Sequence, residues 1–310
     1  MKKLPLLLAA VGLCHPLAHA RIWTSNDGRH LEADYVSSSE DDVKVKRKTD
    51  GRVLTLPLSS LTAADRLYVE GQAEENAQNA TDKGEVELPK DVAELVAEKG
   101  KLIFDDNFNR EDKGEKDDLG EDWSTSSESR AQGDKQNDLV DGTLVMTISP
   151  LADHSISTRH DFEESFKNLV LSLRFMLPED GSLKLAYNDK NHKEVHAGHI
   201  NGITIRTNSI HLDDERTGRF NLKYADDKSS PEAKAAMAAS SKTFPLNLKN
   251  DRWYEIVTWH NDETLTVYID GKEVASFSSP GFGHETKQNF AFAVPKIAVV
   301  DDLKMWEIKE

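Results

Sequence analysis

Residues 21–70 alternate apolar and polar side chains in four short runs. In the third run Val43 and Val45 alternate with lysines, and in the fourth run Leu54, Leu56 and Leu58 share one face. A period of two residues is typical of β-strands that bury one face. The pattern therefore predicts four short strands.

Two Asp-Gly pairs separate these runs and predict hairpins, because Gly28 and Gly51 can adopt the positive φ of tight turns. After Leu58, Ser and Thr residues precede a short helical pattern. Four strands and a helical turn within about fifty residues predict a small SH3-like barrel.

Residues 101–310 contain eleven further alternating runs. The clearest places Leu169, Leu171, Leu173, Phe175 and Leu177 on one face. Only the Ala-rich residues 230–240 have a helical pattern. Many short strands without helices predict a mainly β fold, here an antiparallel two-sheet sandwich after the small barrel.

The pattern divides the chain into four parts: residues 1–20, 21–70, 71–100 and 101–310. Residues 1–20 have Lys2 and Lys3 before an apolar run, and an Ala-His-Ala sequence ending at Ala20, as a cleaved signal peptide does. The alternative, a membrane anchor, needs about twice that apolar length. Residues 71–100 form an acidic linker and a short helix between Pro89 and Gly100. We expect a secreted or periplasmic protein cleaved after Ala20.

The charge of the chain narrows its possible partners, and its cysteine content narrows the ways in which the fold can be stabilised. The net charge is −16, or −18 without Lys2 and Lys3, so nucleic acid and anionic membranes are poor partners. No later stretch is apolar enough for membrane insertion. The single cysteine, Cys14, lies in the signal segment. The secreted chain must therefore be stabilised by its core without disulfides.

Residues 23–69 resemble the first homology domain of the endocytic adaptor Sla-one (SHD1). The matching positions are Trp23, Asp27, Gly28, Leu31, Val43, Asp50, Gly51, Arg52, Leu56, Pro57, Leu58, Leu61, Asp65 and Arg66. The resemblance implies an SH3-like barrel and protein binding of the cytoskeletal or ubiquitin type. Most of these positions belong to turns and core, so a spacer module is the alternative.

Most of residues 101–310 resemble the concanavalin A-like lectin and glucanase sandwiches. The hairpin containing Trp253, Val267, Asp270, Gly271 and Phe277 carries the resemblance. Within that group it is most similar to the laminin-G-like and 3-keto-disaccharide hydrolase-like domains of secreted bacterial proteins. The resemblance implies a jelly-roll fold and carbohydrate as the ligand class.

Polar side chains opposite the apolar faces are candidates for binding sugar hydroxyls or a carboxylate. Asn201, Gly202 and Arg206 partly match an element of the 3-keto-disaccharide hydrolase-like group, but the usual residue between Asn and Gly is missing. Simple exposure to water is the alternative. The candidate ligand-binding residues are Arg174, Lys184, Asn201, Arg206, Asn208 and Lys223.

No catalytic residues are predicted. Sandwich glucanases place their carboxylates in an E-x-D-x-x-E motif, which this chain lacks. Asp213, Asp214 and Glu215 are consecutive and precede a glycine, so we expect them in a solvated loop.

A structural calcium ion is the better of two metal sites that the sequence suggests, the other being His192, His196 and His199 in one loop. If the first and last strands of the sandwich are neighbours, carboxylates from both could supply oxygen ligands. An exposed acidic edge that discourages aggregation is the alternative. The candidate ligands are Asp105, Asp106, Asp301 and Asp302.

The sequence thus favours a secreted binding protein that recognises carbohydrate, or another extracellular ligand, without cleaving it. The first alternative is a glycoside-acting hydrolase of the 3-keto-disaccharide type. The second is a protein–protein adaptor, which follows from the Sla-one resemblance alone.

Overall fold

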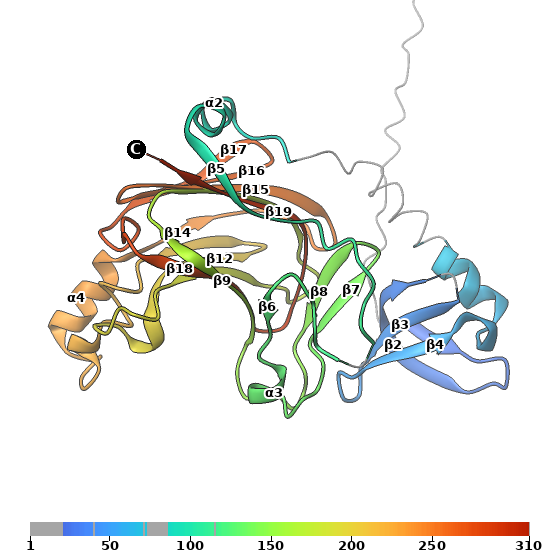
Figure 1. Cartoon of the computed structure of the whole chain (residues 1–310). Helices are drawn as coiled ribbons and strands as arrows, with labels where there is room; N and C mark the ends of the chain where they lie inside the picture. The colour runs from blue at the N-terminus through green and yellow to red at the C-terminus, as the bar shows by residue number, and fades with distance from the viewer. Residues whose placement is uncertain (1–20, 40, 71, 73–85, 115, 310) are drawn as a thin grey trace, which may run out of the picture. The chain divides into compact units, whose positions relative to one another are not determined.

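The computed structural model describes residues 21–309 except residues 40, 71, 73–85 and 115 (Figure 1). The predicted signal segment, residues 1–20, lies outside the described residues. The chain forms two compact units, residues 1–76 and 77–310. In the described parts of both units, no helix is long and apolar enough to span a membrane.

The first unit is the predicted four-stranded antiparallel sheet, in the order β1-β2-β3-β4. Its elements are β1 (Arg21–Thr24), β2 (His30–Ser38), β3 (Asp42–Arg47), β4 (Val53–Pro57) and η1 (Leu58–Ser60), followed by a helix over residues 63–70. The hairpin glycines Gly28 and Gly51 have φ values of 84° and 69°, as expected. The sheet buries Trp23 and its apolar neighbours on one side.

Backbone hydrogen bonds join the two ends of this sheet. Thr62 N donates to Thr24 O at 3.0 Å, and Asn26 N donates to Ser60 O at 2.8 Å. The buried carboxylate of Asp65 adds to this closure by accepting from Thr24 N at 2.8 Å. The segment after β4 therefore returns to the first strand, as a small barrel requires.

The second unit is a sandwich of two antiparallel sheets. The strands are β5 (Gly100–Asp106), β6 (Trp123–Ser124), β7 (Asn137–Val140), β8 (Thr143–Thr147), β9 (Ile156–Phe166), β10 (Leu169–Met176), β11 (Leu183–Asn188), β12 (His199–Arg206), β13 (Ser209–Asp213), β14 (Ser241–Pro245), β15 (Trp253–Asn261), β16 (Thr264–Ile269), β17 (Lys272–Ser278), β18 (Lys287–Val294) and β19 (Ile297–Ile308). The helices are α2 (Lys90–Lys99), α3 (Ser127–Arg130) and α4 (Pro231–Ala239), with 3₁₀ turns η2 (His196–Gly198) and η3 (Leu222–Tyr224).

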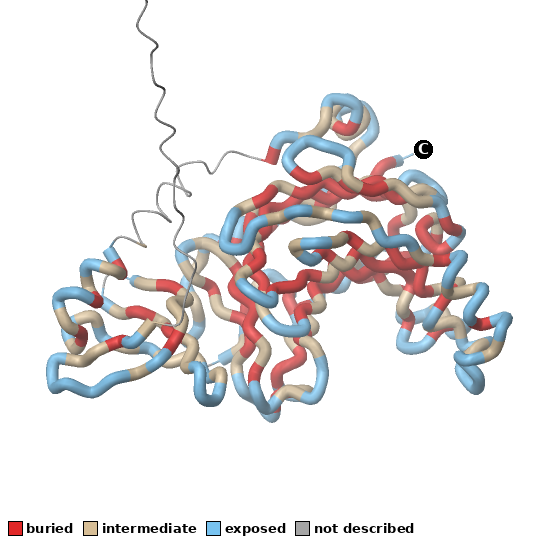
Figure 2. The backbone as a smooth tube through the Cα atoms, turned by 180° about the vertical axis from the view of Figure 1, so that it is seen from behind, coloured by how far each residue is buried: buried red, intermediate tan, exposed pale blue. Residues whose placement is uncertain are grey.

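One sheet, here called the β10 sheet, has the order β17-β16-β15-β10-β19-β8-β7, with β5 also paired to β19. The other, the β12 sheet, has the order β14-β13-β12-β11-β18-β9-β6. The predicted alternation is confirmed, because Leu169, Leu171, Leu173 and Phe175 of β10 face a common core with Ile203 of β12. In Figure 2 the buried segments run along the strands of both layers. The mainly β fold and the two-sheet architecture are as predicted.

Helix α2 covers part of the outer face of the β10 sheet. Val92 is fully buried and belongs to an apolar cluster with Val170 and Val257 of that sheet. The helix ends at the predicted Gly100, whose N–H donates to Val96 O. A Cβ at Gly100 would lie 2.6 Å from Val96 O, so close contact excludes a larger residue there.

Candidate functional site

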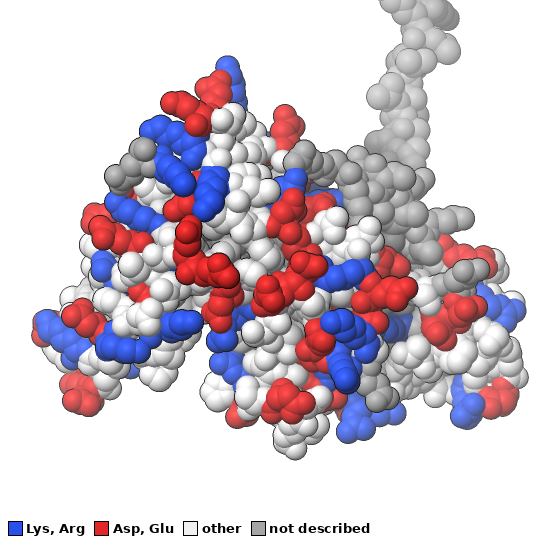
Figure 3. Space-filling model, viewed as in Figure 1, with Lys and Arg blue, Asp and Glu red and all other residues white. Residues whose placement is uncertain are grey.

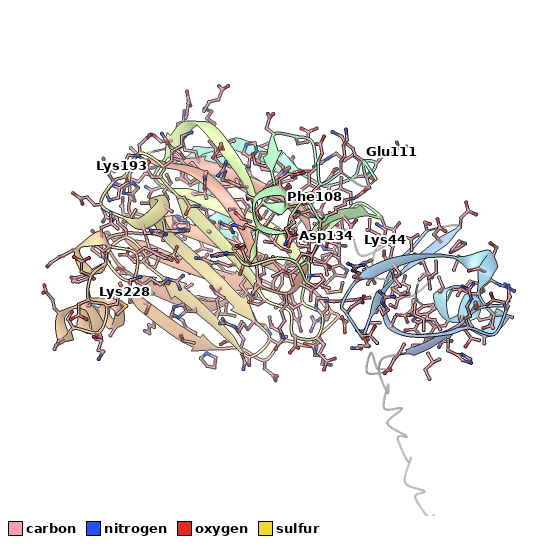
Figure 4. All side chains as sticks on the ribbon, turned by 90° about the horizontal axis from the view of Figure 1, so that it is seen from below. Lys44, Phe108, Glu111, Asp134, Lys193 and Lys228 are labelled. Atoms are coloured by element: carbon pink, nitrogen blue, oxygen red, sulfur yellow. The ribbon has the colours of Figure 1, made fainter. Side chains whose placement is uncertain are left out.

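The outer face of the β12 sheet has a floor of small residues at its centre. Strand register places Gly202 beside Ala186, and Ala186 beside Ala291, across three neighbouring strands. Larger side chains at these positions would stand above the sheet. Neighbouring side chains cover these positions, because Lys184 lies over Gly202 and both alanines are only 4 % exposed. Figure 4 views the second unit from this side, with the loops of Lys193 and Lys228 at one end.

A row of four polar side chains crosses this face, one from each of four adjacent strands. Asn188 Nδ2 donates to Asn289 Oδ1 at 2.7 Å, and Asn289 Nδ2 donates to Asp161 Oδ1 at 3.0 Å. At the other end, His199 Nδ1 lies 3.0 Å from Asn188 Oδ1. The strand register sets this row, because Asn188 lies opposite both His199 and Asn289. We call His199, Asn188, Asn289 and Asp161 the polar row.

A charged cluster lies beside the polar row, at β11, β13 and the segment after β13. Lys184 Nζ lies 2.7 Å from Glu215 Oε1. Arg219 Nε lies 3.1 Å from the same oxygen and 3.0 Å from Asp213 Oδ2. A shared partner at these distances keeps the two carboxylates within about 6 Å of each other, which is within the range used by pairs of catalytic acids.

Gly202 allows this arrangement. A Cβ at position 202 would lie 2.5 Å from Lys184 Cε, because the lysine crosses the glycine to reach Glu215. Glu215 itself is fully buried, and its Oε2 has no hydrogen-bond partner within the described chain. His199 Nδ1 is 3.8 Å from that oxygen.

The environments of the two carboxyl groups differ. Burial raises the pKa of Asp213 to about 6, although Arg219 opposes the change. Burial also acts to raise the pKa of Glu215, but the charges of Lys184 and Arg219 outweigh it and lower the pKa below its usual value. Near neutral pH, Glu215 is therefore ionised while Asp213 exchanges protons readily.

Asp214 fixes the backbone beneath the cluster. Its carboxylate accepts hydrogen bonds from Ser279 Oγ at 2.6 Å, Gly281 N at 2.7 Å and Thr217 N at 3.0 Å. The expectation of a solvated acidic loop is wrong, because Asp213, Asp214 and Glu215 are all at least 95 % buried. Strand β13 ends at Asp213, and Asp214 and Glu215 belong to the segment that follows, where hydrogen bonds and ion pairs to other elements bury them.

The structure separates the predicted ligand-binding residues. Lys184 and Arg206 lie on the outer face of the β12 sheet. Lys184 is opposite Thr204 of the neighbouring strand, and Arg206 is two residues beyond Thr204. Asn208 is an exposed residue of the turn between β12 and β13. Lys223 is an exposed residue of η3 and pairs with Glu232 at 2.7 Å.

Two of the predicted ligand-binding residues do not face this surface. Arg174 lies on the other sheet, is 5 % exposed, and packs 5.2 Å from the centre of the Trp253 ring. Asn201 is fully buried in the interior, where its Nδ2 donates to Gly281 O at 3.1 Å and its Oδ1 lies 3.2 Å from His260 Nε2. A ligand on the outer face of the β12 sheet therefore reaches neither side chain.

The predicted calcium ligands do not form a site. Strands β5 and β19 do pair, with Asp106 opposite Leu303. However, Asp105 and Asp106 are consecutive and point to opposite faces. Asp106 instead accepts from Trp123 Nε1 at 2.7 Å and pairs with Arg110 at 2.6 Å.

The other two aspartates are also unsuited to a shared ion. Asp301 is buried opposite Arg174, and its Oδ1 accepts from Asp302 N at 2.9 Å. The part of the chain that the structure describes includes all four aspartates, and it contains no group of three or more His, Cys, Asp or Glu residues able to hold a metal.

Sequence reasoning missed most of the face that the structure assembles. Asp213 follows the inward-facing Leu212 and is the last outward-facing residue of β13, so the alternation identifies it, but Glu215 lies in the turn beyond the strand and has no such signal. The pairing of Asn188 with Asn289 has no such local signal, because the two residues are 101 positions apart.

No protein-family model matches this chain, and no curated protein matches its sequence. Solved structures similar to it include the laminarinase from Rhodothermus marinus, with 9 % identity and a TM-score of 0.46 over 68 % of this chain and 98 % of that one. A protein of unknown function with a galectin-like fold from Bacillus subtilis has 12 % identity and a TM-score of 0.44 over 68 % and 99 % of the two chains. The carbohydrate recognition domain of Emp47p has 13 % identity and a TM-score of 0.42 over 69 % and 99 %. These are likenesses of fold, and they include both glucanases and lectins.

Proposed function

We propose that the protein binds carbohydrate on the outer face of its β12 sheet. The polar row is the observation that carries the proposal. Sugar hydroxyls donate and accept hydrogen bonds, and the amides of Asn188 and Asn289, the imidazole of His199 and the carboxylate of Asp161 together offer both kinds of partner.

The test uses a glycan array with the full secreted chain, followed by calorimetric titration of the best ligand. Asn289→Ala removes the middle of the polar row and is expected to weaken binding about tenfold, the loss of one or two hydrogen bonds. Asn250→Ala, in the exposed loop before β15, is the matched control and should bind as the wild type does. Absence of any glycan signal above an unrelated protein contradicts the proposal.

A glycoside-acting hydrolase is the second candidate, favoured by the pair Asp213 and Glu215. One carboxyl group with a raised pKa and one with a lowered pKa is the arrangement that acid and base catalysis uses. It ranks second because Glu215 is fully buried and Arg219 lies against both acids. Release of new reducing ends from a bound glycan, abolished in both Asp213→Asn and Glu215→Gln, supports it; binding without cleavage contradicts it.

For the first unit we propose an SHD1-like module. Its role is either to bind a protein or to act as a spacer. Two large apolar side chains support a binding role, because Ile22 is 63 % and Leu67 66 % exposed. Pull-down with the unit intact and with Ile22→Ser plus Leu67→Ser tests it: equal recovery of partners from both contradicts a binding role.

We also propose export, with cleavage after Ala20. N-terminal sequencing of the protein recovered outside the cytoplasm should begin at Arg21. A chain that retains Met1 in the cytoplasm contradicts this.

A further inference from the structure

Basic side chains gather on one part of the outer face of the β12 sheet. The register aligns Lys184, Thr204 and His211 across β11, β12 and β13. Arg206 lies two residues beyond Thr204 on the same face of β12, and Arg219 follows β13. We call Lys184, Arg206, His211 and Arg219 the basic corner.

The basic corner carries more positive than negative charge. Lys184 and Arg219 share the carboxylates of Glu215 and Asp213. Arg206 is exposed and has no ion-pair partner among the described residues. Two acids therefore face three permanent cations.

The pKa of His211, within the basic corner, reflects this excess of positive charge. Burial lowers the pKa of His211, and the charges of Arg219, Arg206 and Lys184 lower it further, against one opposing contribution from Glu215. This positive field occurs in a chain whose net charge is −16. On the face shown in Figure 3, acidic side chains cover the middle of the second unit, and Lys and Arg lie both near its top and near its lower edge on the α4 side.

We propose that the ligand of this face is a carboxylate-bearing carbohydrate, such as a uronate oligomer, whose carboxylate binds Arg206 at the basic corner. The planar guanidinium matches a carboxylate with two parallel hydrogen bonds. The hydroxyls of the same chain lie along the polar row, which shares β11 and β12 with the basic corner. This inference rests on the proposed carbohydrate binding and specifies its ligand class.

The test compares ligands that differ only in their carboxylates. Oligomers of galacturonate, glucuronate, mannuronate and guluronate are titrated into the full secreted chain at pH 7, each beside its carboxyl-reduced, neutral form. We expect at least one uronate oligomer to bind about tenfold more tightly than its reduced form, as one charge-assisted contact provides. Arg206→Gln should remove most of that preference while leaving the affinity for the reduced oligomer unchanged.

Arg252→Gln is the matched control. Arg252 is an exposed arginine that precedes β15 of the β10 sheet and pairs with Asp270 at 3.0 Å, so its loss should leave the preference for uronates intact. Binding of neutral glycans with no preference for a carboxylate overturns the inference but leaves the proposed function standing. Binding of neither class overturns both. A preference that persists in Arg206→Gln overturns the role of the basic corner.

Discussion

The glycine at position 202 determines which side chains meet on the outer face of β12. Its lack of a Cβ lets Lys184 cross the strand and reach Glu215. In Gly202→Ala the lysine must move, so the buried carboxylate keeps only Arg219 as a charged partner. We expect a loss of about 1–3 kcal/mol in the free energy of unfolding, because a buried charge loses a partner.

The pKa of Glu215 should also rise in that variant, since Lys184 is one of the charges that lower it. Chemical denaturation and an NMR titration of the glutamate measure the two effects. Thr204→Ala, on the same face of the same strand, is the control. If both variants lose equal stability and the glutamate titrates unchanged, the lysine contact is unimportant.

At the scale of single strands, the closure of the first unit depends on one buried acid. Asp65 accepts from Arg21 Nε at 2.9 Å, Thr24 N at 2.8 Å and Thr62 Oγ1 at 2.8 Å. Burial acts to raise its pKa, but these hydrogen bonds outweigh it, and the pKa is lower than usual. The stabilisation is therefore present above the unfolded pKa of about 4 and is lost as the pH falls through the lower folded value.

Asp65→Asn should cost about 2 kcal/mol at pH 7 and progressively less in acid. Hydrogen exchange of the amides in β1 and β2 at several pH values measures this. Asp27→Asn changes an exposed aspartate in the first hairpin and should leave exchange in those strands unchanged. Equal protection in Asp65→Asn and the wild type would show that the acid is dispensable.

Helix α2 gives a second prediction at this scale. Val92 is fully buried against the β10 sheet, so Val92→Ala should lower the stability of the second unit by about 1–2.5 kcal/mol. Thermal unfolding of the full chain measures it. Glu94→Ala on the exposed side of the helix is the control, and an equal change in both variants argues against packing as the cause.

The elements differ in how far the sequence predicts them. Alternation identifies strands because it is a local property, and it places Leu171 and Ile203 correctly in the core. Alternation also places Asn201 on the same side of β12 as Ile203, and the structure agrees. The partial match to a known family instead favoured a surface position for Asn201. Pairing between distant strands is not local, so neither the polar row nor the sheet on which Arg174 lies could be derived.

At the scale of the whole molecule, one buried lysine links stability to pH. Lys287 is fully buried on β18, and its Nζ donates to Phe282 O and His284 O at 2.9 Å each. Burial, with smaller contributions from the charges of Lys167 and Arg216, lowers its pKa to about 7. The unfolded chain, with a lysine pKa of about 10.4, therefore binds more protons than the folded chain between these two values.

Stability attributable to this lysine must then rise as the pH increases from about 7 to about 10, which is opposite to the trend for a lysine that gains an acidic partner. Lys287→Met leaves two carbonyl oxygens without their donor and should be less stable at pH 9. Its disadvantage relative to the wild type should shrink toward pH 6, where the wild type must hold a buried charge. Urea denaturation of both proteins at pH 6, 7, 8 and 9 gives the difference in the free energy of unfolding. The exposed Lys272→Met should show no such trend, and parallel curves for Lys287→Met and the wild type would mean that Lys287 stays protonated in the folded core.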